Sequence, residues 1–144
     1  MRKDAKRNTK LAHSGSHPSD QSGILNPPIY RASTVDYGTV AKMHALRDNP
    51  NDNFVYGRLG TPTSAAFEEA VAALEGAERT IAVGSGLAGI SAAMLAFVKA
   101  GDHVLVCDSA YSPTRNLCEN FLKRFGVTTT YYDPVIGSAI SDLF

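Results

Sequence analysis

In the second half of the chain, three short segments of strand character alternate with segments of helical character. They span residues 79–83, 103–107 and 127–132. The middle run, HVLVC, is apolar enough to be buried on both faces, which is typical of strands in parallel sheets. Strands that alternate with helices at this spacing predict a parallel sheet joined by right-handed crossovers. We therefore expect an α/β fold in which helices flank a partial parallel sheet.

Helix signals fill the intervals between these segments and also precede the first of them. Thr61 is expected to cap a helix that has Pro62 at its first position, and a glycine follows the last turn. Three apolar residues of this helix recur at i, i+4 and i+7 and therefore share one face: Phe67, Val71 and Leu74. Two more helices are predicted, one from the glycine-rich turn 84–89 to Val98 and one over residues 112–125.

Residues 1–60 show no sustained periodicity. The run Asn26-Pro27-Pro28 forces an extended path, because the residue before a proline avoids helical geometry. A short helix is predicted over residues 39–47, and the turn cluster DNPNDN ends it. We therefore predict an irregular N-terminal arm with a short helix over 1–60, and an incomplete α/β domain over 61–144.

The predicted sheet is small for an α/β protein. About three strands are expected, whereas the mean sheet has five or six. The sequence also stops at Leu143 and Phe144, in the middle of an α/β pattern and without a polar capping element. We therefore expect the sequence to be the N-terminal piece of a longer protein. The alternative is a small complete α/β domain.

Composition excludes several classes of function. Lysine plus arginine equals aspartate plus glutamate, at 14 each, which argues against a nucleic-acid surface. Five of the bases lie in the first ten residues, where a solvated terminus is favoured over a nucleic-acid arm. The longest apolar stretch, 87–98, is shorter than the ~20 residues of a membrane span, and no signal peptide is evident. We expect a cytoplasmic protein that binds neither nucleic acid nor membrane.

The cysteines and histidines predict no metal site. The only two cysteines, Cys107 and Cys118, are eleven positions apart, and buried, reduced thiols are favoured over ligands or a nucleophile. The four histidines show no metal-ligand spacing.

The sequence GSGLAG at residues 84–89 matches the pattern G-x-G-x-x-G between a predicted strand and a predicted helix. Glycines let the backbone approach a phosphate, and the amides of a helix N-terminus bind it. Asp108 lies about 20 residues further on, where a dinucleotide-binding fold places its ribose-binding acid. Three interpretations stay open: glycines that only permit close packing, a dinucleotide site, and, as the favoured one, a site for another phosphate ligand.

Four segments together carry a more specific signal: SGILNPPIYRAST at 22–34, YGRLGTPT at 56–63, GSGLAG at 84–89 and GDHVLVCDSAYSPTR at 101–115. In this order they resemble the Cys/Met-metabolism family of pyridoxal-phosphate enzymes. The run GVTTTYYDPVIG at 126–137 resembles its bacterial cystathionine β-lyase branch. The resemblance implies that the sheet belongs to the large domain of the aspartate-aminotransferase type of fold, known as fold type I.

The resemblance also implies a cofactor, pyridoxal 5'-phosphate, and the residues that bind it. Tyr56 and Arg58 would reach the phosphate of a neighbouring subunit, and the planar guanidinium fork of arginine suits such a contact. The backbone amides of Gly86 and Leu87 would bind the phosphate within the chain, and Tyr111 would stack on the pyridine ring. Without these motifs, a half-buried core tyrosine and a solvated arginine would be the favoured interpretations. Ser85 could add a hydroxyl contact, and Asp108 is favoured as a cap of the loop after its strand.

For activity, the resemblance implies a carbon–sulfur lyase that cleaves cystathionine to homocysteine, pyruvate and ammonia in methionine biosynthesis. Its substrate would be a small sulfur amino acid, and the enzyme would be a homo-oligomer, a dimer or tetramer. A cystathionine γ-lyase or γ-synthase and a non-enzymatic Rossmann-like nucleotide-binding fragment are the alternatives.

The groups that complete catalysis are expected outside this sequence. In the family, the lysine that binds the cofactor covalently, the acid at the pyridine nitrogen and the arginine for the substrate carboxylate all lie well beyond residue 144. None of the six lysines of this chain stands in the Ser/Thr-rich setting of the family's catalytic lysine. We therefore predict no catalytic residue here, and expect the 144-residue chain alone to be inactive.

Overall fold

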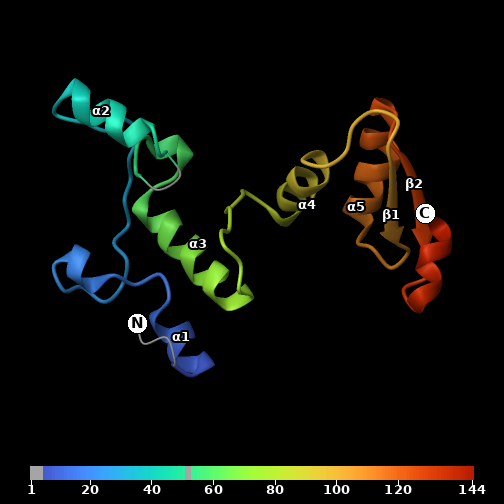
Figure 1. Ribbon diagram of the computed structural model, residues 1–144, viewed down its shortest axis with the longest axis horizontal. Coiled ribbons are helices and arrows are strands. Elements are labelled where there is room, and N and C mark those ends of the chain that lie inside the picture. The colour runs from blue at the N-terminus through green and yellow to red at the C-terminus, as the bar shows by residue number, and fades with distance from the viewer. Residues whose placement is uncertain (1–4, 51–52) are drawn as a thin grey trace. The chain divides into compact units, whose positions relative to one another are not determined.

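The computed structural model describes residues 5–50 and 53–144. The chain divides into two compact units, Met1–Ala82 and Val83–Phe144, which run from blue to green and from yellow to red in Figure 1. The division at residue 61 into an arm and a cofactor-binding domain stays a prediction. None of the helices in the described ranges has the length and apolarity that crossing a membrane requires.

Helices dominate the described part of the N-terminal unit. In chain order its elements are α1 (Arg7–His13), η1 (Pro18–Gln21), α2 (Val40–Arg47), η2 (Gly57–Leu59) and α3 (Pro62–Glu75). The Thr61 hydroxyl accepts a hydrogen bond from the N–H of Ser64, and the Ser64 side chain bonds back to Thr61. This capping box, followed by proline at the first position, fixes the start of α3. The sequence analysis predicted α2 and α3, but not α1.

The segment after α1 lies close against α3, and small residues allow this approach. A Cβ at Gly15 would stand 2.0 Å from the carbonyl oxygen of Ala66, and the φ of +72° at Gly15 also favours glycine. Beside it, His17 Nε2 lies 2.6 Å from Glu69 Oε2. The hydrogen bond to Glu69 raises the pKa of His17. At a pH below the ordinary pKa of histidine, this ion pair makes its full contribution to the stability of the docked segment. The contribution is lost as the pH rises through the raised pKa of His17.

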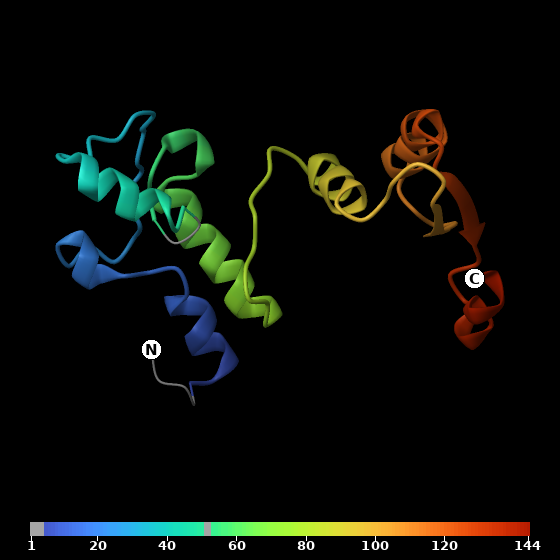
Figure 2. The ribbon, with the colours of Figure 1, turned by 45° about the horizontal axis from the view of Figure 1, so that its top comes forward.

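The C-terminal unit consists of a parallel strand pair and the helices around it. Its elements are α4 (Gly86–Leu95), β1 (His103–Cys107), α5 (Ser112–Asn116), η3 (Leu117–Phe121), η4 (Leu122–Phe125), β2 (Thr128–Tyr132) and η5 (Gly137–Leu143). The strands pair in parallel from His103 opposite Thr128 to Cys107 opposite Tyr132. The elements α5, η3 and η4 form one continuous helical segment of α, π and 3-10 geometry, which Figure 2 shows beside the strands.

Backbone hydrogen bonds extend the strand pairing at both ends. Before the strands, the Gly101 N–H donates to the carbonyl of Gly126 at 3.0 Å. After them, the Asp108 N–H donates to the carbonyl of Tyr132 at 2.8 Å. The ladder therefore continues into the loop that follows β1. This fixes the start of that loop relative to β2.

The sequence-based expectation of a parallel strand pair with a crossover helix is confirmed, but the strand predicted over 79–83 is wrong. In the described residues this segment has no strand partner: Ala82 N–H donates instead to Glu68 Oε1 of α3 at 2.7 Å. Ile81 is 82% exposed. A strand is stabilised by the strand beside it, so an apolar run without such a neighbour stays irregular. The predicted helix to Val98 is also shorter, because α4 ends at Leu95.

The core of the C-terminal unit lies between the strand pair and the helical segment that crosses over between them. Its buried members come from β1, the helical segment and the residue just before β2: Val106, Leu117, Cys118, Leu122 and Val127. Leu122 has no exposed surface. Burial also raises the pKa of the Cys118 thiol, in line with the predicted role of a buried, unreactive cysteine. One side chain, Leu122, is thus central to the packing of this unit.

Replacing Leu122 by alanine should destabilise the protein by about 2–5 kcal/mol, because it removes a fully buried side chain and leaves a cavity. The matched control is Leu95→Ala at the end of α4, where the side chain is 48% exposed and the expected loss is about 1 kcal/mol or less. Urea unfolding followed by far-ultraviolet circular dichroism measures both. Equal losses for the two variants would contradict the assigned core.

Candidate functional site

The N-terminus of α4 presents backbone amides that the helix itself does not use. Ser85 caps the helix: its hydroxyl accepts from the N–H of Ala88 at 3.1 Å, and its carbonyl accepts from the N–H of Gly89. Gly86 and Leu87 are the first two helical residues, so their N–H groups have no carbonyl partner within the helix. The partial positive charge of a helix N-terminus adds to these donors. Together they can bind an anion such as a phosphate.

The three glycines of the 84–89 turn play different roles. Within the C-terminal unit, no heavy atom lies within 4 Å of the position that a Cβ would take at Gly84 or at Gly86. At Gly89 the same position lies 3.4 Å from Cγ2 of Val83. A Cβ at Gly89 would therefore be in ordinary van der Waals contact with Val83, whereas the first two glycines leave the backbone open. This favours a ligand over the packing interpretation for the front of the turn.

Tyr111 lies at the carboxyl end of β1, where open parallel sheets bind their ligands. It is the N-cap of α5, and its carbonyl accepts from the N–H groups of Thr114 at 2.8 Å and Arg115 at 3.3 Å. Its side chain is 75% exposed. An exposed ring on a backbone fixed by the helix start can stack on a flat ligand.

Asp108, the residue in the position of a ribose-binding acid, forms an ion pair within its own loop. Its Oδ1 lies 2.7 Å from Nη1 of Arg115, and this contact raises the pKa of Arg115 above its usual value. The carboxylate is thus directed to the helix that follows. This supports the loop-capping interpretation of Asp108 over the dinucleotide one. Sequence reasoning missed Arg115, although its spacing of seven from Asp108 across a predicted helix start was a readable signal.

Tyr56 and Arg58 lie in the N-terminal unit, around η2. The Arg58 guanidinium carbon is 5.7 Å from the centroid of the Tyr56 ring. Between them, the Gly57 N–H donates to the carbonyl of Ser33 at 2.7 Å, and a Cβ at Gly57 would stand 1.9 Å from the carbonyl oxygen of Ala32. The glycine of YGR is therefore required by a close approach of two backbone segments. This contact sets the geometry of the tyrosine and arginine on either side.

The five predicted cofactor-binding residues thus divide between the units. Gly86, Leu87 and Tyr111 belong to the C-terminal unit, and Tyr56 and Arg58 to the N-terminal unit. The role of each toward a cofactor stays a prediction. In the described ranges, no group of three or more histidine, cysteine, aspartate or glutamate side chains could hold a metal ion.

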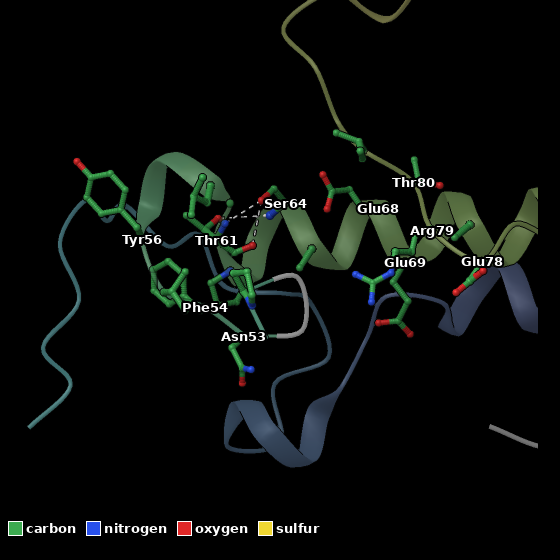
Figure 3. Close-up of a pocket in the computed structure, with 18 residues that line it drawn as sticks. Asn53, Phe54, Tyr56, Thr61, Ser64, Glu68, Glu69, Glu78, Arg79 and Thr80 are labelled. Carbon is green, nitrogen blue, oxygen red and sulfur yellow. Dashed lines mark hydrogen bonds between the residues drawn. The ribbon is translucent and has the colours of Figure 1, made fainter. Parts of the chain in front are cut away.

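The N-terminal unit also contains a pocket of about 820 Å³ that sequence reasoning did not predict. Figure 3 shows it between the start of α3 and the segments on either side of that helix. Tyr56 and Phe54 line it together with the acidic residues Glu68 and Glu69 of α3. Of the YGR residues, Tyr56 therefore forms part of the wall of a pocket in its own unit.

Comparison with known proteins defines the class. The family described as "Cys/Met metabolism PLP-dependent enzyme" matches residues 8–144. The chain therefore belongs to the Cys/Met metabolism family of pyridoxal-phosphate-dependent enzymes. The resemblance carried by the four motifs is confirmed at this level.

Two individual relatives are similar to this chain over almost its whole length. A Rhizobium johnstonii protein that carries a provisional cystathionine beta-lyase name is 47% identical over 95% of this chain and 34% of the relative. The Escherichia coli cystathionine beta-lyase MetC is 38% identical over 95% of this chain and 35% of its own length. The chain thus spans about a third of these relatives.

Solved structures share the fold. The crystal structure of cystathionine gamma-lyase from Lactobacillus plantarum, complexed with L-serine, matches with a TM-score of 0.76 and 33% identity. The match covers 90% of this chain and 31% of that structure. The helices and the two-stranded parallel sheet are therefore those of a pyridoxal-phosphate enzyme fold.

Replacing Gly57 by alanine should destabilise the N-terminal unit by about 1–3 kcal/mol, because the new Cβ would overlap the Ala32 carbonyl. Gly84→Ala is the matched control, since nothing within the C-terminal unit lies within 4 Å of its Cβ position. The control should change the free energy of unfolding by less than about 0.5 kcal/mol. Urea unfolding measures both free energies. An unfolding midpoint of Gly57→Ala equal to that of the wild type would contradict the close contact between Gly57 and the Ala32 carbonyl.

Proposed function

We propose that this chain is the N-terminal part of a pyridoxal-phosphate-dependent carbon–sulfur lyase of the cystathionine β-lyase type. Its β1–β2 pair would be part of the larger parallel sheet of a fold type I large domain, the aspartate-aminotransferase type. The observation that carries the proposal is the open N-terminus of α4 in the same unit as the exposed ring of Tyr111, in a chain of this family. The β-lyase names of similar proteins support the reaction type.

The residues present fit the cofactor. Pyridoxal phosphate, when bound, supplies an electron sink for negative charge at the α-carbon of an amino acid. The N–H groups of Gly86 and Leu87 donate to the phosphate, and the helix dipole adds to the attraction. Tyr111 positions the pyridine ring by stacking on its face. Together these three residues orient the cofactor rather than perform proton transfer.

Tyr56 and Arg58 complete the phosphate site from a second copy of the chain. A contribution of these two residues to a neighbouring subunit is what the resemblance of the YGR motif to the family implies. The enzyme would therefore act as a homo-oligomer, a dimer or tetramer, and it would be cytoplasmic. The lysine that carries the cofactor and the substrate-binding arginine would come from the remaining two thirds of the protein.

The proposed reaction is β-elimination from cystathionine, which yields homocysteine, pyruvate and ammonia on the route to methionine. The second candidate is γ-elimination, as in a cystathionine γ-lyase. It is favoured by the structural similarity to the Lactobacillus plantarum cystathionine gamma-lyase. The two candidates share the phosphate-binding elements and differ in the bond cleaved.

A single assay separates the candidates. The full-length protein is purified with pyridoxal phosphate, its visible absorbance is recorded, and it is incubated with cystathionine. Pyruvate and homocysteine identify the β-lyase, whereas 2-oxobutyrate and cysteine identify the γ-lyase. A full-length protein without a visible cofactor band would overturn the proposal as a whole. The 144-residue chain with added cofactor is expected to release no pyruvate.

Replacing Arg58 should weaken cofactor binding in the full-length protein by about ten- to hundredfold, because it removes charge-assisted hydrogen bonds to the phosphate. Arg58→Ala and Arg58→Lys should both lose affinity, since lysine lacks the planar fork. Arg47→Ala is the matched control: Arg47 lies 5.8 Å from the ring of Tyr37, as Arg58 lies 5.7 Å from that of Tyr56. Cofactor titration gives the affinities. If both Arg58 variants bind the cofactor with wild-type affinity, Arg58 does not contact the cofactor phosphate.

A further inference from the structure

Arg115 connects the loop after β1 to two other parts of the C-terminal unit. Its Nη1 donates to both the carbonyl oxygen of Asp108, at 2.9 Å, and the carboxylate of the same residue, at 2.7 Å. Its guanidinium carbon lies 3.9 Å from the centroid of the Tyr131 ring on β2. Its Nε lies 3.9 Å from Oε1 of Glu119, one helical turn further on. A single side chain thus joins the loop, the helical segment and the second strand.

These contacts hold both ends of the segment Asp108–Tyr111. At its start, the Arg115 side chain binds Asp108, whose N–H also donates to the carbonyl of Tyr132. At its end, the backbone N–H of the same Arg115 donates to the carbonyl of Tyr111. The segment between these points is four residues long. The Arg115 side chain therefore restrains the start of this segment, and backbone hydrogen bonds from Thr114 and Arg115 to the Tyr111 carbonyl hold its end.

Arginine is the side chain that this arrangement requires. An exposed ion pair alone contributes little to stability. Here the planar guanidinium also donates to a backbone carbonyl and stacks on the face of Tyr131, which packs against the core of the unit. The side chain of Arg115 is only 34% exposed, compared with 62% for that of Asp108. Arg115 is thus fixed by the core of the unit, and through its hydrogen bonds it restrains the more exposed Asp108 of the loop.

We propose that Arg115 is a positioning residue that holds the segment Asp108–Tyr111, so that Tyr111 presents its ring to the cofactor. The part of this inference that concerns the cofactor rests on the proposed function. The part that concerns the segment rests only on the contacts of the C-terminal unit. Arg115 itself does not touch the cofactor or the substrate in this assignment. It acts through Tyr111.

The test uses full-length protein with Arg115→Met, which keeps the aliphatic stem, and Arg115→Lys, which keeps the charge but loses the fork and the stacking. Arg124→Met is the matched control, because Arg124 is exposed and lies on the same helical segment. Amide hydrogen exchange of residues 109–112 is measured without cofactor. Cofactor affinity and the visible circular dichroism of the bound cofactor are then measured, together with the unfolding midpoint of the cofactor-free form.

Arg115→Met should raise exchange in residues 109–112 about fivefold or more, weaken cofactor binding about three- to tenfold and change the visible circular dichroism. Its unfolding midpoint should stay close to that of the wild type. Arg115→Lys should fall between Arg115→Met and the wild type, and Arg124→Met should match the wild type. A merely structural role would lower the midpoint and leave the dichroism per bound cofactor unchanged.

Two results would overturn the inference. Unchanged exchange in Arg115→Met would show that the segment is held without Arg115, whatever the protein binds. Raised exchange with unchanged affinity and dichroism would show that the segment does not set the cofactor's position. A wild-type protein that binds no pyridoxal phosphate would instead overturn the proposed function, and with it the cofactor part of the inference. The exchange data on the cofactor-free protein would still decide whether Arg115 holds the segment.

Discussion

The parallel pairing of β1 with β2 is the constraint on which the C-terminal unit depends. Parallel strands need a crossover connection, and here the helical segment from Ser112 to Phe125 provides it. The crossover covers one face of the strand pair and buries Leu122 completely. Because the segment must begin where β1 ends, Tyr111 becomes the cap of its first helix. The placement of the candidate cofactor-binding tyrosine thus follows from the strand pairing.

The change of helical geometry within the crossover has a packing reason. Leu117 and Leu122 are five positions apart, and both belong to the buried core. The i→i+5 hydrogen bonding of a π turn suits this spacing, whereas α geometry places i+3 and i+4 on one face. The π turn Leu117–Phe121 lies just before Leu122, and both leucines are buried in the core together with Cys118. The same segment carries Arg115 and Glu119, so core packing and the polar network that restrains the loop lie on one helix.

Small residues and capping interactions organise the N-terminal unit in place of a large core. Gly15 permits the approach of a loop to α3, and Gly57 permits the approach of the YGR segment to Ala32. At both positions a Cβ would overlap a backbone carbonyl oxygen, that of Ala66 for Gly15 and that of Ala32 for Gly57. In this unit the glycine of the YGR segment is thus a packing residue. The tyrosine and the arginine beside it are the residues that we propose for phosphate recognition.

Local signals in the sequence determined much of what the structure contains. Thr61 with Pro62 specified the start of α3, the run HVLVC specified a parallel strand, and the glycine turn specified an open helix N-terminus at Gly86. The expected burial of HVLVC on both faces is not observed, since only Val106 of this strand is buried. The order of the motifs also determined the family. These features depend on nearest neighbours in the chain, on side-chain polarity and on backbone freedom. Neighbouring residues, side-chain polarity and backbone freedom can all be read directly from the sequence.

Only the tertiary structure decided which apolar runs became strands and which charges met. Residues 79–83 carry a strand pattern but form no strand in the described part of the chain, because a strand is stabilised by hydrogen bonds to a neighbour that local sequence does not supply. The contact of Arg115 with Tyr131 joins residues 16 positions apart, and the close approach at Gly57 joins it to Ala32. Such contacts arise only when the chain returns on itself. For that reason the identity of the candidate site residues was readable from sequence, whereas the network that holds them in place was not.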